Sequence, residues 1–216
     1  MKNKSLFIGI AVVVLIGSYF LGNYIFKQQQ NENLALLGQE NAELFVRDYS
    51  PRMGSSKPKV LLIEFLDPEC ESCRAFYPYV KQIMKDHMED VQLIVRYMPF
   101  HKNSKFVIKV LEASRKQNKY WEVLEILFRY QPEWGNHHNP NPELIWTYLP
   151  MVGIDIAKIK EDMKNPEFDK IIAQDKADGE LLKVRATPSF FINGKPLTEF
   201  GYQPLLNMIK TELEKK

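Results

Sequence analysis

Residues 60–73 read VLLIEFLDPECESC and hold both cysteines of the 216-residue chain, Cys70 and Cys73. The first seven of these residues are apolar except Glu64, which is typical of a buried strand, and a proline-containing turn separates them from a segment with helical periodicity. The cysteines therefore fall at the start of a helix, where unpaired N–H groups and the positive end of the helix dipole stabilise a thiolate. Two intervening residues place Cys73 one turn after Cys70, so the pattern favours a redox-active dithiol.

Two other uses of paired cysteines stay open from the residues alone, half of a zinc site and an inert structural disulfide. Tetrahedral zinc takes four ligands, so two histidines would have to complete the site. The candidates lack the spacing of a ligand set; they are His87, His101, His137 and His138. We therefore expect no metal and no bound cofactor, only a partner that resets the cysteine pair.

The N-terminus carries a long uncharged segment, residues 5–26, after Lys2 and Lys4. About 20 apolar residues suffice to cross a bilayer, and the two lysines favour a cytoplasmic N-terminus. A cleaved secretory signal is the alternative, but such a signal ends at small residues. This segment ends among bulky aromatic residues, namely Tyr19, Phe20, Tyr24 and Phe26. We expect residues 1–27 to be an uncleaved single-pass anchor in the inner membrane, with the catalytic part in the periplasm.

The charges of the chain are nearly balanced, with 29 Lys and Arg against 27 Asp and Glu. A protein that binds nucleic acid usually concentrates an excess of basic residues on one face. We therefore expect no nucleic-acid partner. A compartment outside the cytoplasm would let a disulfide persist.

Residues 28–42 are rich in Gln and Asn and predict a tether or short helix, and residues 43–216 carry the pattern of one α/β domain. Within it, residues 43–49 predict a first strand and residues 60–66 a buried second one. After the helix that begins near the cysteines, residues 91–97 predict another strand. The order strand, helix, strand predicts a parallel pair joined by a right-handed crossover.

From about residue 103 to residue 184 the pattern is helical, with interruptions at proline and glycine. A strand is predicted at 189–192, and Asn193-Gly194 after it is a strong hairpin signal, with the second strand at 195–200. An amphipathic helix over residues 203–215 closes the chain. A helical block is thus inserted between strands of one sheet.

This order of segments resembles the thioredoxin superfamily, and within it the DsbA-like branch that carries a helical insertion. Four motifs carry the resemblance: EFLDPECESC at 64–73, RYMPF at 96–100, YWEVLEILF at 120–128 and TPSFFING at 187–194. The similarity covers about residues 43–214. It implies a thioredoxin-like fold and an enzyme that exchanges disulfides with protein substrates containing thiols or disulfides.

The resemblance also implies roles for residues outside the cysteine pair. Thr187-Pro188 would form a cis peptide facing the cysteines, with the Thr187 backbone presented to a bound substrate strand. An ordinary trans turn is the alternative, since only about 5–6% of X-Pro bonds are cis. Glu64 would be buried with a raised pKa and would shuttle the proton that Cys73 loses. The alternative for Glu64 is a strand-end carboxylate in contact with water.

The expected reaction is thiol-disulfide exchange through a mixed disulfide at Cys70. Its direction depends on Glu71 and Ser72, because strongly oxidising DsbA relatives have Pro-His at these positions. Carboxylates at Glu71 and in the preceding turn oppose the thiolate, and the helix terminus favours it, so we expect the two effects nearly to cancel. We predict a Cys70 less acidic, and a disulfide less oxidising, than in those relatives.

Two further functions stay open. Thr187 before the proline is also typical of reductases and isomerases, which would be fed by a membrane electron donor. A tethered chaperone or peptide-binding module with a structural disulfide is the alternative outside the enzymes. Replacing Cys70 with Ser separates these classes, because only the module would keep its function.

Overall fold

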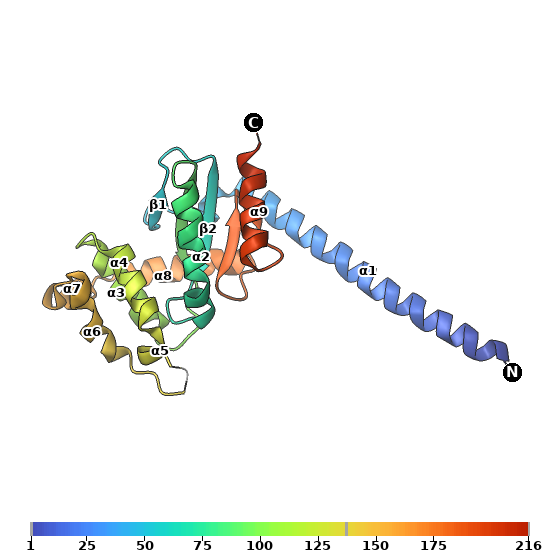
Figure 1. The fold of residues 1–216 in the computed structure, drawn as a ribbon, viewed down its shortest axis with the longest axis horizontal. Coiled ribbons are helices and arrows are strands. Elements are labelled where there is room, and N and C mark those ends of the chain that lie inside the picture. Colours follow the sequence, from blue (N-terminus) through green and yellow to red (C-terminus); the bar gives the residue numbers. More distant parts are fainter. Residues whose placement is uncertain (1, 137, 216) are drawn as a thin grey trace.

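A five-stranded mixed sheet forms the centre of the domain, with strands in the order β1-β3-β2-β4-β5 (Figure 1). The computed structural model describes residues 2–136 and 138–215. Strands β2 and β3 run parallel, and the other neighbouring strands pair antiparallel. The strands are β1 (Arg52–Gly54), β2 (Val60–Leu66), β3 (Val91–Tyr97), β4 (Ser189–Ile192) and β5 (Lys195–Pro196).

Helix α2 (Glu71–His87) connects the two parallel strands and buries one face against the sheet. The buried face contains Phe76, Val80, Ile83 and Met84, which recur at helical spacing. The predicted strand-helix-strand unit is therefore confirmed, and its helix begins immediately after Cys70.

A block of helices stands between β3 and β4, as predicted. Figure 1 shows α3 to α7 gathered on one side of α2, with α8 running back towards the sheet. The helices are α3 (Ser104–Arg115), α4 (Tyr120–Arg129), α5 (Gln131–Trp134), α6 (Ile145–Tyr148), α7 (Ile156–Asp162) and α8 (Glu167–Leu181), with short 3-10 segments at Pro142–Leu144 and Leu149–Val152. The last helix, α9 (Tyr202–Leu213), packs against β2 and β4.

The two faces of the sheet bury different sets of residues, because side chains alternate along a strand. Leu62 and Leu66 of β2 pack with α2, α3, α4 and α9. Ile63 and Phe65 pack on the opposite face with Leu44 and the segment after α8. Glu64 has the same parity as Leu62 and Leu66, so it points to the face that α2 covers.

The strand predicted at residues 43–49 is wrong. This segment forms a 3-10 turn at Ala42–Leu44 followed by further turns, and the first strand is β1. Leu44 and Phe45 are nevertheless buried, and the ring of Phe45 lies 5.1 Å from that of Phe191, centroid to centroid. Three apolar residues in a row do not determine a backbone conformation.

The second strand of the C-terminal hairpin is shorter than predicted. Residues 195–200 were expected to pair, and only Lys195–Pro196 does so. After Pro196, the backbone N–H of Leu197 still donates a bond of 2.8 Å to the Phe190 carbonyl, and residues 198–200 do not continue the strand.

Helix α1 (Lys2–Glu40) is continuous through the region where a separate tether was expected to begin, at residue 28. Figure 1 shows its N-terminal part extending away from the domain. Residues Ile8–Leu34 are long and apolar enough to cross a membrane. The C-terminal part of α1 contacts β5.

Candidate active site

Cys70 occupies the N-cap position of α2, and Cys73 lies in the first turn of the same helix. Both cysteines are free thiols, and they differ in exposure. Cys70 keeps 8% of its surface accessible, whereas Cys73 keeps none. An incoming sulfur atom can therefore reach Cys70 first.

Hydrogen bonds around Cys70 lower the pKa of its thiol to about 5. The largest contribution comes from the side chain of Cys73, and further bonds come from the Thr187 side chain and the backbone of Cys73 and Ser72, while burial opposes them. Because these donors favour the thiolate, Cys70 is the more acidic thiol of the pair.

The thiol of Cys73 has the opposite character. Burial raises its pKa well above the ordinary value, and the negative charges of Cys70 and Glu64 raise it further. Cys73 therefore keeps its proton until a base removes it, which suits a resolving cysteine.

Glu64 is buried in the centre of β2, with 2% of its surface exposed. Its Oε1 atom has no hydrogen-bond partner among the described residues, and burial raises the pKa of its carboxyl to about 8. The alternative interpretation, a strand-end carboxylate in contact with water, is therefore wrong. Its charge influences Cys73, so this acid lies where a proton donor for that thiol is needed.

The Thr187-Pro188 peptide bond is cis, as the family resemblance implied. It faces the cysteines, because the Cys70 thiol donates a hydrogen bond of 3.2 Å to the Thr187 carbonyl oxygen. This bond favours the protonated thiol, and it would be lost in the thiolate, which the donors named above stabilise. Thr187 thus contacts the reacting sulfur atom in either state.

The carboxylate of Asp67, in the turn before Cys70, binds the loop after β3. It accepts hydrogen bonds from the backbone N–H of Phe100 at 2.8 Å and of His101 at 3.2 Å, and from the His101 ring at 2.8 Å. The contact with Asp67 raises the pKa of His101, and the charge of Cys70 adds to the effect. His101 therefore lies in the electrostatic field of the active site.

Glu69 is held in the same way. Its two oxygens accept bonds of 2.6 and 2.7 Å from the backbone and side chain of Asn103. The largest contributions to the lowered pKa of Cys70 are hydrogen bonds from Cys73, Thr187 and Ser72, and neither Asp67 nor Glu69 is among them. Hydrogen-bond donors from residues 100–103 bind these carboxylates. The sequence alone does not indicate that these donors lie nearby.

Gln131 of α5 is a further site residue that sequence reasoning missed. Its amide donates to the Pro68 carbonyl at 2.9 Å and to the Cys70 carbonyl at 3.1 Å. Its oxygen accepts a bond of 3.0 Å from Arg74. Gln131 therefore fixes the turn that presents Cys70, from a position 61 residues further along the chain.

A family model described as Thioredoxin matches residues 47–211. The chain belongs to the thioredoxin family. Its match includes every element of the site just described. The fold class predicted from the sequence, a thioredoxin-like α/β domain with a helical insertion, is thereby confirmed.

Relatives place this thioredoxin-family chain near the DsbA-like proteins, as predicted. It is 26% identical over 182 residues to disulfide bond formation protein D of Bacillus subtilis, covering 77% of this chain and 78% of that protein. The structure of oxidised BdbD from the same organism matches with a TM-score of 0.69 at 25% identity, covering 77% and 94% of the two chains. The thiol-disulfide exchange protein alpha-DsbA2 of Wolbachia pipientis shares the fold, with a TM-score of 0.72, 18% identity and 85% and 97% coverage.

The domain also occurs inside larger proteins. The chain matches the Na(+)/H(+) antiporter NhaA 3 of Salinispora tropica at 26% identity over 145 residues, which is 66% of this chain and 21% of that protein. The chain therefore spans about a fifth of the antiporter relatives that it matches.

The remaining predicted site residues of this thioredoxin-family domain are Glu71 and Ser72, both exposed in the first turn of α2. The backbone of Ser72 hydrogen-bonds Cys70, as noted above. Of the paired loop histidines, His138 is exposed, and His137 lies outside the described residues. Within residues 2–136 and 138–215, no three His, Cys, Asp or Glu side chains gather as a metal site.

Proposed function

We propose that this protein is a thiol-disulfide oxidoreductase that exchanges disulfides with protein substrates through Cys70 and Cys73. The observation that carries the proposal is the asymmetry of the pair. Cys70 keeps 8% of its surface accessible and has a pKa of about 5, whereas Cys73 has no accessible surface and a raised pKa. A structural disulfide needs no such division of roles.

In the oxidising direction a substrate thiolate attacks the Cys70 sulfur of the Cys70–Cys73 disulfide. A mixed disulfide forms at Cys70, and Cys73 leaves as a thiolate that must gain a proton. A second substrate thiolate then attacks the substrate sulfur of the mixed disulfide, and Cys70 leaves. Two electrons pass from the substrate to the protein, and the low pKa of Cys70 makes it a good leaving group.

Glu64 supplies the proton that Cys73 gains, and it takes the proton back when the reaction runs in reverse. Its burial, its unpartnered oxygen and its pKa of about 8 support this role. A group with a pKa near the working pH can both give and accept a proton.

Client polypeptides would meet an aromatic surface beside the cysteines. Phe76 of α2 packs against Phe200 and Tyr79, with ring centroids 4.8 and 5.4 Å away. Phe200 is 58% and Tyr79 47% exposed, so both can contact apolar side chains of an unfolded client. Thr187 and Pro188 would receive the client backbone next to Cys70.

The protein is anchored in the inner membrane through α1, with its catalytic domain in the periplasm and a membrane partner that resets the cysteines. The length and apolar character of Ile8–Leu34 support the anchor. The identity of Glu71 and Ser72 supports a disulfide less oxidising than that of Pro-His relatives. A reductase or isomerase fed by a membrane donor is the second candidate, favoured by Thr187 before the cis proline.

A trapping experiment tests the proposal. In Cys73→Ser the resolving thiol is absent, so a client joined to Cys70 should accumulate as a mixed disulfide that dithiothreitol releases. The matched variant Cys70→Ser should trap no client. Equal trapping by both variants, or trapping by neither, would refute the proposal, and holdase activity retained by Cys70→Ser would favour a chaperone module.

A further inference from the structure

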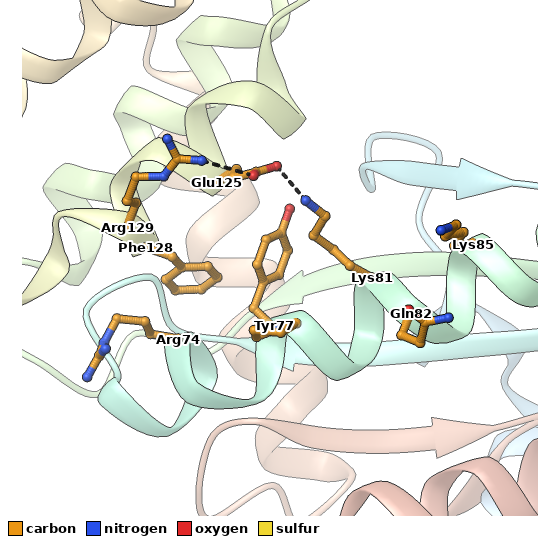
Figure 2. Close-up of a pocket in the computed structure, with 9 residues that line it drawn as sticks. Arg74, Tyr77, Lys81, Gln82, Lys85, Glu125, Phe128 and Arg129 are labelled. Carbon is orange, nitrogen blue, oxygen red and sulfur yellow. Dashed lines mark hydrogen bonds and ion pairs between the residues drawn. The ribbon is translucent and has the colours of Figure 1, made fainter.

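A groove of about 540 Å³ lies between α2 and α4, and no step of the mechanism uses it. Figure 2 shows side chains from both helices meeting in it. Its floor is aromatic, because the rings of Tyr77 and Phe128 pack with centroids 5.2 Å apart and Pro78 lies beside them. Such a floor can bury an apolar side chain of a ligand.

The rim of the groove is strongly basic. Four cationic side chains line it against a single carboxylate, that of Glu125. Lys81 and Arg129 share this carboxylate at 2.8 and 3.4 Å, yet they remain 50% and 62% exposed. The other two cations are Arg74 and Lys85, and among the described residues Lys85 has no ion pair. The rim therefore carries a net positive charge. The ion pairs of Glu125 with Lys81 and Arg129 show how these cations bind a carboxylate.

Of the residues that line the groove, Arg74 is the nearest to Cys70 along α2. Arg74 lies one turn after Cys70 on the same helix and binds Gln131 at 3.0 Å. Gln131 in turn donates to the Cys70 carbonyl at 3.1 Å. A polypeptide lying in the groove would thus bring a cysteine a few residues away within reach of Cys70.

We propose that this groove docks an acidic segment of the client polypeptide during disulfide exchange. Carboxylates of the segment pair with Lys81, Lys85 and Arg129, and an apolar side chain rests on Tyr77 and Phe128. The inference rests on the proposed function and names its substrate class, proteins whose reactive cysteine lies close to acidic residues. The exchange step itself is unchanged, since docking only raises the local concentration of the client thiol.

The test uses the full-length protein in a non-ionic detergent and two cysteine peptides of equal length. One peptide carries Asp and Glu around an apolar residue, and the other carries Asn and Gln at the same positions. At low salt the acidic peptide should exchange faster by about three- to tenfold, which a few exposed ion pairs can supply. The difference should shrink in high salt, because exposed charges are screened.

Two neighbouring substitutions should change this preference in opposite directions. Lys85→Gln removes an unpaired cation and should lower it, whereas Glu125→Gln removes the competing carboxylate and should raise it. Lys164→Gln, at an exposed position outside the groove, is the matched control and should leave it unchanged. Damage to the fold would not lower the peptide preference in one variant and raise it in the other. The rate of exchange with dithiothreitol should be the same in all three variants.

Equal rates for the two peptides, with normal exchange with dithiothreitol, would overturn the docking site and leave the proposed function intact. Absence of exchange with both peptides and with dithiothreitol would refute the proposed function instead. If Lys85→Gln weakens binding to phosphatidylglycerol vesicles but leaves peptide preference unchanged, the groove recognises lipid and the proposal is overturned.

Discussion

Buried carboxylates lie on both faces of the central sheet, and their surroundings differ. On the α2 face, Glu64 has an oxygen with no hydrogen-bond partner in the described part of the chain, and burial raises its pKa to about 8. On the α8 face, Asp175 and Asp178 bind the guanidinium of Arg96, a side chain that is fully buried. Asp175 also accepts bonds from the Tyr97 backbone at 2.8 Å and the Tyr49 hydroxyl at 2.7 Å.

Buried carboxyl groups behave differently according to the hydrogen-bond donors around them. Bonds with Arg47 and Arg96 lower the pKa of Asp178 although burial opposes them, so Asp178 stays ionised. Burial raises the pKa of Asp175, and its bonds with Arg96, Tyr49 and Tyr97 counteract that shift. A carboxyl group without donors keeps its proton near neutral pH and can exchange it. We therefore expect the α8 face to contribute stability and the α2 face to contribute chemistry.

Cys70→Ser should show the largest difference between an effect on activity and an effect on stability. Exchange with any thiol or disulfide substrate should be lost, because the nucleophile is gone. The free energy of unfolding should change little, since the substitution removes neither a core side chain nor the Arg96 network. Residual exchange above the background rate, measured with a fluorescent cysteine peptide, would place the chemistry elsewhere.

Replacement of Arg96 by Leu should have the largest effect on stability. The substitution leaves Asp175 buried without its cation and Asp178 with Arg47 alone, and removing one partner of a buried ion pair typically costs about 3 to 5 kcal/mol. Denaturant unfolding measures the loss, and Arg129→Leu, at an exposed position, is the control. The fraction that remains folded should exchange disulfides at the normal rate. An unfolding midpoint equal to that of the parent protein would contradict a structural role for the network.

Glu64→Gln should slow exchange by roughly 10- to 100-fold at neutral pH, because an amide cannot transfer the proton that Cys73 needs. Trapping of clients at Cys70 should persist, since attack on Cys70 does not require Glu64. Stopped-flow fluorescence follows the resolution step. If Glu64→Gln leaves the rate of this step unchanged, Glu64 does not transfer the proton.

The same variant should alter the pH dependence of stability. Folding raises the pKa of Glu64 from 4.5 to about 8, so between these values the folded state binds more protons than the unfolded state. Stability should therefore fall as pH rises through this window, by up to about 1.4 kcal/mol per pH unit from this group. Glu64→Gln should lose that slope, and an identical slope in both proteins would show that Glu64 is not buried as described.

The smallest expected effect is that of Arg47→Gln. Arg47 binds Asp178 at 2.9 Å from a partly exposed position, and Asp178 would keep Arg96. We expect a loss of roughly 1 kcal/mol, as is usual for an ion pair open to solvent. The loss should diminish at acidic pH, because Asp178, with its lowered pKa, contributes stability above its unfolded pKa and loses it as pH falls. A loss as large as that for Arg96→Leu would mean that the two arginines are equivalent.

Much of the fold and of the candidate site around Cys70 could be predicted from the sequence, because the signals are local. The apolar run with a single acid fixed both the strand at residues 60–66 and the burial of Glu64. The cysteine spacing and the helical pattern after it placed Cys70 at a helix N-terminus. The cis peptide at Thr187-Pro188 required the family resemblance, since local chemistry alone favours the trans form.

What could not be predicted depends on contacts between distant segments. Arg96 and Asp175 are 79 residues apart, and nothing near either residue indicates the pairing. Likewise Asp67 accepts one bond from nearby Glu69, but its other donors come from a loop 33 and 34 residues later. Because these distant donors were unknown, its carboxylate was expected to oppose the Cys70 thiolate. Charges counted along the chain are a poor guide to a pKa when their partners are unknown.

The proposed function requires Cys70 and Cys73 to interconvert reversibly between dithiol and disulfide. The full-length protein is equilibrated in buffers with graded ratios of reduced to oxidised glutathione, and free thiols are counted by alkylation and mass spectrometry. The account predicts a single two-electron transition in which both thiols disappear together, with Cys70 the one that forms a mixed disulfide with glutathione. Two thiols that stay reduced, or a disulfide that stays closed, across the whole range would contradict it.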